Sequence, residues 1–409
     1  MALDFSGQNL RGRSFIGRDL AGANFSNAHI QGANFSESVL SGACFRQAKA
    51  GTSYRSRVLL WLLLIVSGAM VGGIGTVIAD TVNTDYLTIF GPRDAILAFS
   101  VLTILGVVLC LRDLLSAIIV TLLCGLLTWI SFIVWEFTYS GDFLHVLVGA
   151  EAITVDVITM IVIFWAGLSG VIGLCSVLMA SAHFQAHCRR QIGPFEMVTW
   201  VSAMVIALTA GLYLPGTVAK VNAFVDTAIV WWLSIYASRQ IVREHPRYRW
   251  FRSIALSVGA WGGTNFRQAK LSGADFSLAR LNATAFTAAT LTRTCFREAQ
   301  FLDYALVNGT LLEQSAVRRL VVTGQGARQN YTGLDLRGAY LVDTDLLGAD
   351  LTDADISRGD LTGARLVESQ LVRTQAVATC FRGAQLTGSC LESWNIDTTT
   401  QLEGVVCDY

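Results

Sequence analysis

The chain has 409 residues, of which 53% are hydrophobic and 15% are charged, and its mean hydropathy is +0.51. This composition is too apolar and too poor in charge for an ordinary soluble protein of this length. The 30 Lys and Arg residues balance the 30 Asp and Glu residues, so bulk charge gives no argument for nucleic-acid binding. Nine cysteines without paired spacing, several of them in apolar segments, are expected to be reduced thiols.

The first 50 residues place a large apolar residue, which we call a centre, at every fifth position. Small residues stand two positions before many of these centres. An α-helix buries every third or fourth residue and a strand every second, so a period of five matches neither. It predicts short extended segments separated by bends and stacked around one continuous core. The centres are Phe5, Leu10, Phe15, Leu20, Phe25, Ile30, Phe35, Leu40 and Phe45. Because repeats begin at once, no cleavable signal is expected.

The middle of the chain, residues 58–241, has a different composition. Six apolar segments are each long enough to cross a hydrocarbon core of about 30 Å. The loops assigned to one side carry ten basic residues and those on the other side two, which predicts that both termini are cytoplasmic. The six segments are 58–79, 94–111, 114–135, 157–180, 197–218 and 221–238.

The period of five resumes at Phe266 and continues to Leu311. The pentad Phe-Arg-Gln-Ala-Lys that starts at Phe45 recurs at Phe266, so the same five residues flank the apolar region. Our hypothesis is that the two arrays form one β-helix in space, with residues 50–262 inserted. The alternative is a chance recurrence among similar repeats.

The pattern lapses after Leu311, although its phase is kept up to Leu336. We expect a short helix from Leu312 to Val321 and a glycine-containing loop, bulging from one coil. From Leu336 the array runs to Leu391 with leucine at most centres. Trp394 then stands where a small residue belongs, and it is predicted to close the last coil.

These arrays resemble the pentapeptide-repeat family, whose pattern is A-(D/N)-L-x-x. The resemblance implies a right-handed, four-sided β-helix in which four pentads make one coil and coils stack about 4.8 Å apart. The centre and the small residue two before it would point inward, and the other three positions outward. With the apolar middle, the chain is similar to membrane-anchored cyanobacterial members of the family.

The predicted fold is therefore a multi-domain membrane protein, a quadrilateral β-helix interrupted by an α-helical transmembrane bundle of six spans. Its domains are 1–49 (repeats), 50–262 (transmembrane bundle with a basic junction) and 263–409 (β-helix interrupted near 312–333 and stacked on 1–49). The predicted structural core comprises Phe25, Phe35, Phe45, Phe266, Leu271, Phe276, Leu336, Leu341, Leu346, Leu351 and Leu361.

Several polar groups are candidate sites, and each has a plainer interpretation. An acidic belt is formed by Asp335, Asp345, Asp350, Asp355 and Asp360. Some soluble family members mimic DNA with such a surface and inhibit DNA gyrase, but the family pattern itself asks for Asp or Asn at this position. Four cysteines share the position without metal-ligand spacing: Cys44, Cys295, Cys380 and Cys390. We predict no metal, no cofactor and no catalytic residue.

Asp226 is the one acidic residue inside a predicted span, which makes it a possible functional residue of an ion or proton pathway. It lies near Lys220, where headgroups or water would solvate it. His183 and His187 are expected at a solvated rim rather than in a metal site. The glycine stripe from Gly68 to Gly72 is expected to let helices pack closely.

The sequence predicts no enzyme, because it has no recognisable catalytic or nucleotide-binding motif. The first functional interpretation is a membrane-anchored scaffold that presents a cytoplasmic β-helix for protein–protein interaction at a cyanobacterial plasma or thylakoid membrane. Its expected partners are membrane lipids and unidentified proteins, with a possible homo-oligomer and no nucleic acid. The alternative is a channel or transporter with a β-helical cap, and a third is a gyrase inhibitor.

Overall fold

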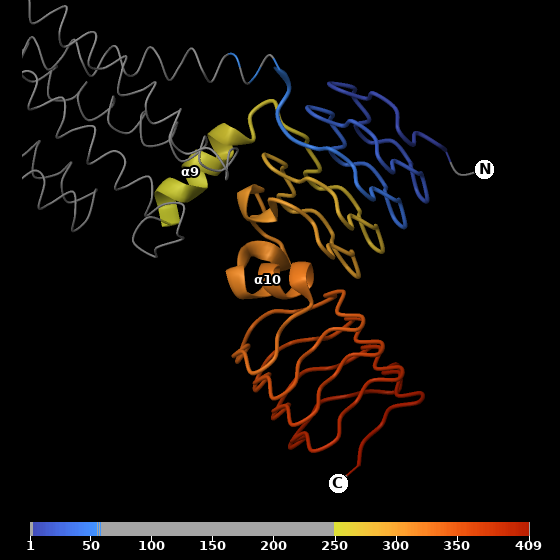
Figure 1. Ribbon diagram of the computed structural model, residues 1–409, viewed down its shortest axis with the longest axis vertical. Helices are drawn as coiled ribbons and strands as arrows, with labels where there is room; N and C mark the ends of the chain where they lie inside the picture. Colours follow the sequence, from blue (N-terminus) through green and yellow to red (C-terminus); the bar gives the residue numbers. More distant parts are fainter. Residues whose placement is uncertain (1–2, 55, 57, 59–248, 409) are drawn as a thin grey trace, which may run out of the picture. The chain divides into compact units, whose positions relative to one another are not determined.

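The computed structural model describes residues 3–54, 56, 58 and 249–408 (Figure 1). The chain divides into two compact units, one made of Met1–Arg57 with Leu256–Tyr409 and the other of Val58–Ala255. Almost all of the second unit lies outside the described residues. In the described part the helical elements are α9 (Arg249–Gly259), η3 (Leu302–Tyr304), η4 (Leu311–Glu313) and α10 (Ser315–Thr323).

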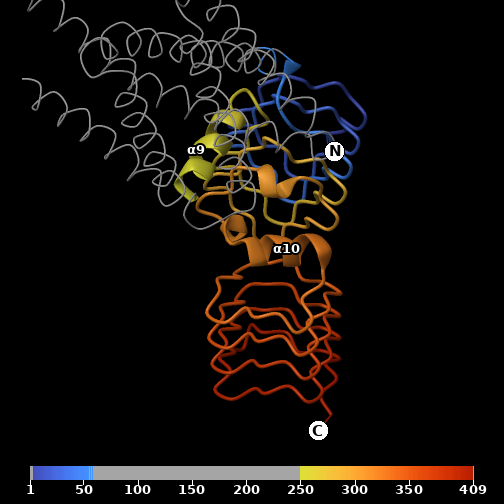
Figure 2. The same cartoon turned by 60° about the vertical axis from the view of Figure 1, so that its left-hand side comes forward.

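The first unit is a parallel, four-sided β-helix (Figure 2). Each side of a coil contributes one β-bridge, made by the residue before the centre. Asp4 pairs with Asn24 and Asn24 with Cys44, a step of four pentads that places one coil on the next. In the regular coils the backbone N–H of the centre donates to the coil that follows, as Phe25 does to the carbonyl of Cys44 at 2.6 Å. The extended segments are short because each pentad also contains a turn.

The core follows directly from the alternation of phenylalanine and aliphatic centres. Because four pentads make a coil, phenylalanines on alternate pentads line up in two columns. Rings in one column stack, with Phe25 and Phe45 at 4.8 Å between centroids and Phe45 and Phe276 at 4.7 Å. Rings of the two columns meet edge to face, as Phe35 and Phe45 do at 5.8 Å. Such geometries are the ones that aromatic pairs prefer. After α10 the core is mainly leucine.

The array before residue 51 and the array after residue 262 form one stack. Asn34 pairs with Asn265, and Cys44 pairs with Asp275. The two ends of the connecting segment lie side by side, since the Ser53 N–H donates to the Gly262 carbonyl at 3.1 Å. Thr264 joins them, because its hydroxyl donates to the Ile30 carbonyl at 2.8 Å and accepts from the Gly51 N–H at 3.0 Å.

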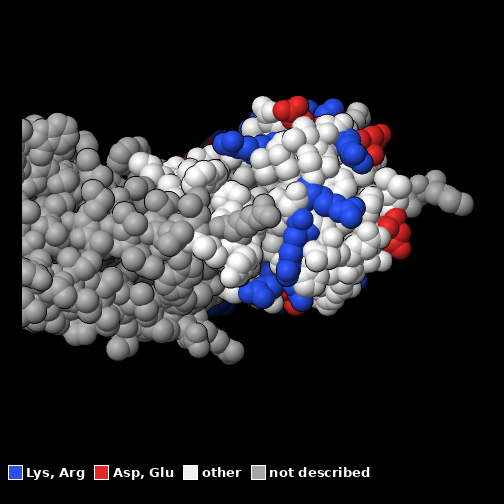
Figure 3. All heavy atoms as spheres, turned by 90° about the horizontal axis from the view of Figure 1, so that it is seen from above, with Lys and Arg blue, Asp and Glu red and all other residues white. Residues whose placement is uncertain are grey.

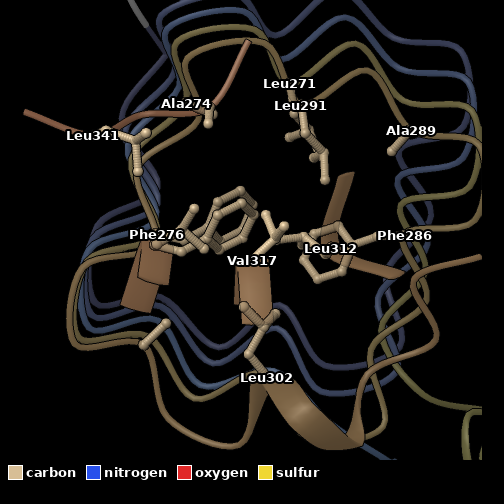
Figure 4. Close-up of a cluster of buried hydrophobic side chains, with 14 of the residues drawn as sticks. Leu271, Ala274, Phe276, Phe286, Ala289, Leu291, Leu302, Leu312, Val317 and Leu341 are labelled. Atoms are coloured by element: carbon tan, nitrogen blue, oxygen red, sulfur yellow. The ribbon is translucent and has the colours of Figure 1, made fainter. Parts of the chain in front are cut away.

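The bulging helix expected after Leu311 is in fact stacked within the β-helix. Figures 1 and 2 show α10 between the coils that precede it and those that follow. Its Val317 and Leu320 are buried, and Val317 lies with Phe276 and Phe286 in the core (Figure 4). The helix ends at Gly324, whose φ of 65° is the usual left-handed cap. The coils therefore resume at Gln325, earlier than the predicted boundary near 333.

The centres predicted between Phe301 and Leu311 are displaced by one residue. Ala285 pairs with Leu306, one residue beyond the usual step of four pentads, so Leu306 makes the bridge and Val307 becomes the centre. Phe301 turns outward at φ 64°, and Leu302 takes its place in the core. Figure 4 shows Leu302 and Leu312 pointing inward.

Two predictions are wrong. The fold class of the described residues does not include a transmembrane bundle of six spans, and the predicted multi-pass membrane location with cytoplasmic termini is not supported. A spanning helix needs about 20 apolar residues. In the part of the chain that the structure describes, α9 has 11 residues and α10 has 9, and no helix is long and apolar enough to cross a bilayer. The six predicted spans lie outside the described residues, apart from Val58. The fold class is corrected to the four-sided β-helix.

Candidate protein-interaction site

The outer surface of the β-helix is made by three of the five positions in each pentad. The centre and the residue two before it are buried, as Phe25 and Ala23 are, while the other three positions are wholly or partly exposed. The first coil departs from this rule. Arg13 and Arg18 occupy its small position and are exposed, because no coil lies above them. Figure 3 looks onto this end, where basic side chains spread over much of the described surface.

One side of the early coils carries a basic face, which we define as Arg11, His29, Lys49 and Arg280. His29, Lys49 and Arg280 lie on successive coils. The Arg11 guanidinium lies 3.3 Å from the His29 Nδ1 atom. Burial, followed by the charges of Lys49 and Arg11, lowers the pKa of His29. The Arg280 guanidinium lies over the Phe301 ring, 5.4 Å from its centroid.

The coils after α10 carry the opposite charge. Residues 324–408 contain 6 Arg and 12 Asp or Glu, whereas residues 3–50 and 263–314 together contain 10 Lys or Arg and 7 Asp or Glu. The structure gives the five aspartates of the predicted acidic belt a role in folding. Each accepts a hydrogen bond at Oδ1 from the backbone N–H two residues further on, as Asp350 does from Thr352 at 3.0 Å. These bonds close the turns of the pentads.

A cleft of about 670 Å³ opens where the coils before and after α10 meet. Its volume is within the range of ligand sites in proteins. Residues from the last coil before the helix, from the segment around η4 and from the first coils after the helix line it. They are Ala289, Leu291, Thr292, Gly309, Thr310, Leu311, Glu313, Asp335, Arg337, Gly338, Ser357, Arg358 and Val377.

One end of the cleft is closed by direct contact between its two walls. The Arg293 N–H donates to the Gly338 carbonyl at 2.6 Å, and a Cβ on Gly338 would lie 3.1 Å from the Thr292 Cα. The Arg293 side chain crosses the joint and donates to the carbonyls of Arg358 and Ala378 at 3.1 and 3.3 Å. The cleft is therefore closed at Arg293 and Gly338, and its two walls move apart with distance from this contact.

The charges inside the cleft are unequally paired. Arg337 donates to Asp335 at 2.7 Å and lies 3.7 Å from Asp355, and Arg337 lowers the pKa of Asp335. Glu313 accepts the Gly309 N–H at 3.3 Å. Arg358 is exposed and forms no ion pair in the described part of the chain. It is the cation that a ligand can reach without breaking a salt bridge.

The eleven predicted core residues are all buried in the β-helix. Cys44 and Cys295 lie in one column with Asp275 between them, and Ser26 contacts Cys44 at 3.1 Å. Within the described residues no group of three or more His, Cys, Asp or Glu side chains is arranged to hold a metal ion. Trp394 packs edge to face on Phe381, with ring centroids 5.2 Å apart, but another partial coil follows it.

Several predicted sites lie outside the described residues: Asp226, His183, His187 and the stripe Gly68–Gly72. The cleft was missed by sequence reasoning. Its lining residues are spread along the sequence from Ala289 to Val377, and the only local signal is the lapse of the repeat around α10. The interruption of the repeat does not show which backbone groups of the neighbouring coils remain without hydrogen bonds.

A family model described as pentapeptide repeats (8 copies) matches residues 19–50, 262–301 and 330–366. All three segments lie in the coils of the β-helix, which also include residues outside them. No curated protein matches the chain.

Solved structures that resemble the chain include HetL, a pentapeptide-repeat protein involved in heterocyst differentiation regulation in the cyanobacterium Nostoc. It is 12% identical, covers 98% of this chain and 88% of its own, and has a TM-score of 0.22. Rfr23 from the cyanobacterium Cyanothece is 20% identical over 35% of this chain and 60% of its own, with a TM-score of 0.11. A pentapeptide-repeat protein of the Arabidopsis thaliana thylakoid lumen is 22% identical over 34% and 61%, with a TM-score of 0.08. Scores this low carry no functional argument.

Proposed function

We propose that this chain, whose repeats belong to the pentapeptide-repeat family, is a non-enzymatic scaffold that binds other proteins on the outer faces of its β-helix. The observation that carries the proposal is that different positions of each pentad have separate structural roles. Two positions build the core and the turn is closed by the residue before the centre, so many outward side chains are free to vary without loss of fold. Such a surface suits protein recognition.

Two observations support partner binding on separate faces. Stacked rings before α10 and backbone ladders on both sides of it hold each face in a fixed geometry, so little ordering is required on association. The basic face and the acidic coils after α10 differ in charge, which favours partners of opposite potential at each. No observation favours the channel or transporter, because Asp226 and the predicted spans lie outside the described residues.

The test uses the full chain with two sets of charge-neutralising substitutions. One variant carries Arg11→Gln, Lys49→Gln and Arg280→Gln on the basic face. The matched control carries Asp343→Asn, Glu368→Gln and Glu392→Gln on the coils after α10. Both should keep the wild-type Tm, because all six side chains are outside the core.

Partners are captured by chemical cross-linking in the native cell and identified by mass spectrometry. We expect a reproducible partner, linked to exposed β-helix positions, that one variant loses and the other retains. The proposal is contradicted if no partner is linked to the β-helix, or if both variants recover the same partner in full.

A further inference from the structure

The cleft beside α10 is bounded by two strand edges that lack the hydrogen bonds made elsewhere in the β-helix. On the upper wall, Phe286 donates its N–H to the next coil, at the Leu306 carbonyl, but the N–H of Leu291 has no acceptor among the described residues. The carbonyl of Ala289 likewise has no donor in that part of the chain, whereas its equivalent in the preceding coil, Ala269, accepts from Thr290.

The opposite wall, formed by the first coil after α10, also lacks backbone hydrogen bonds along its edge. Asp355 donates its N–H to the Leu334 carbonyl, but the N–H of Asp335 has no acceptor in the part of the chain that the structure describes. The carbonyls of Asp335 and Arg337 also accept no hydrogen bond from a described residue. These residues line the cleft, so the unpaired groups of both walls border the same space.

We propose that this cleft binds an extended peptide segment of a partner protein, which adds a strand between the two coil edges. A strand offers an N–H and a carbonyl to each side at the spacing of the neighbouring coils, about 4.8 Å. It would accept from Leu291 and donate to Ala289 on one side, and pair with Asp335 and Arg337 on the other. The inference rests on the proposed function only in that the ligand is a polypeptide.

The side chains around the cleft specify the peptide further. Arg358 has no opposite charge, so it favours an acidic side chain on the ligand. Arg337 is held by Asp335 and Asp355 and is less available. Ala289 and Leu291 point into the core (Figure 4), so alternate side chains of a strand paired beside them point the same way and must be small or apolar.

The probe is a fluorescent synthetic peptide with the sequence of residues 347–355, LGADLTDAD, which contains the strand-forming residues of two successive sides of a coil and carries acidic residues. Its matched control has the same sequence with methylated amides at alternate residues, which removes donors and keeps every side chain. Binding to the full chain is measured by fluorescence anisotropy. We expect the plain peptide to bind and the methylated peptide to lose binding.

Hydrogen exchange gives the position of the bound peptide. The amides of Leu291 and Asp335 should exchange rapidly in the free protein and become protected on binding. Arg358→Gln should weaken binding about fivefold, as expected for one exposed ion pair. Arg328→Gln is the matched control, because Arg328 is also exposed at positive φ but does not line the cleft.

The inference is overturned if the plain peptide does not bind at about 1 mM, if the methylated peptide binds equally well, or if Leu291 and Asp335 gain no protection. These outcomes are separable from the test of the proposed function. Loss of peptide binding leaves capture by the basic face intact, and loss of capture in the basic-face variant leaves the cleft unchanged.

Discussion

The turn residue two positions after each centre lies in the left-handed region throughout the β-helix. Glycine occupies many of these positions, including Gly22 at φ 66°, and other residues occupy the rest, including Glu37 at φ 60°. A side chain in this conformation costs roughly 1–2 kcal/mol relative to glycine. The fold tolerates that cost because backbone bonds to the next coil fix the turn, as the Glu37 N–H donates to the Arg267 carbonyl.

Gly22→Ala isolates this conformational cost, because a Cβ at Gly22 would have no atom within 4 Å. We expect the free energy of unfolding to fall by about 1 kcal/mol, measured by denaturant titration. The matched control Ala21→Gly, at an exposed position before the turn residue, should change it less. An unchanged stability in Gly22→Ala would contradict the account of the turn.

Aspartates that close the turns make the β-helix sensitive to acid. Hydrogen bonds from Thr352 lower the pKa of Asp350, and those from Thr399 lower the pKa of Asp397, below the usual 3.8. The unfolded chain then binds protons at a higher pH than the folded chain does. The stabilisation is complete above the unfolded pKa and is lost as pH falls through the lower folded pKa. We expect the Tm to decrease as pH falls below about 4.

Asp350 provides the residue-level check. Asp350→Ala removes the bond to the Thr352 N–H and should cost about 1 kcal/mol at neutral pH. Asp350→Asn keeps an acceptor oxygen but has no charge to titrate, so it should retain more of the stability and show a smaller loss between pH 5 and pH 3. Equal acid sensitivity of Asp350→Asn and the wild type would exclude a contribution from this carboxylate.

At the scale of the element, the phenylalanine columns dominate the coils before α10. Phe276 stacks on Phe45 and Phe296 and meets Phe266 edge to face. Phe276→Ala should therefore lower the free energy of unfolding by about 3–5 kcal/mol. Phe276→Leu keeps most of the volume and should cost clearly less. Similar effects of the two substitutions in equilibrium unfolding would show that stacking and volume do not determine this core.

The period of five predicts the coils because it is a strong local signal. Near Phe301, however, it does not determine which residue of each pentad points into the core. Leu306 and Val307 are both aliphatic, so either fits a core centre. The choice is made by packing: Leu302 fills the core while Phe301 turns outward beneath Arg280. This exchange depends on a residue from the previous coil and is invisible in the local pattern.

The place of α10 within the stack was also not predictable from sequence. Leu320 of the helix reaches the next coil, where a Cβ on Gly326 would lie 2.7 Å from the Leu320 Cδ1 atom. Gly326 is thus a centre without a side chain because the helix supplies the apolar group. Gly326 lies at the period of five that links Leu311 to Leu336, but nothing in the local sequence indicates which residue packs against it. The unpaired edges that form the cleft follow from the same arrangement.

At the scale of the whole molecule, two sequence segments separated by more than 200 residues build one β-helix. The recurring pentads at Phe45 and Phe266 are both regular coil pentads, and their rings meet edge to face at 5.4 Å. The paired ends at Ser53 and Gly262 allow a long insertion without an interruption of the coils. The basic face depends on this arrangement, because Lys49 and Arg280 come from different segments.

The most direct test of this arrangement is amide hydrogen exchange on the full chain, with and without Phe266→Ala. In the wild type, the amides of Phe35 and Phe45 should be protected, because they donate to the carbonyls of Asn265 and Asp275. Phe266→Ala should reduce that protection in residues 33–48. If residues 33–48 exchange rapidly in the wild type, or are unaffected by Phe266→Ala, the two segments do not form one β-helix and the proposed binding faces do not exist.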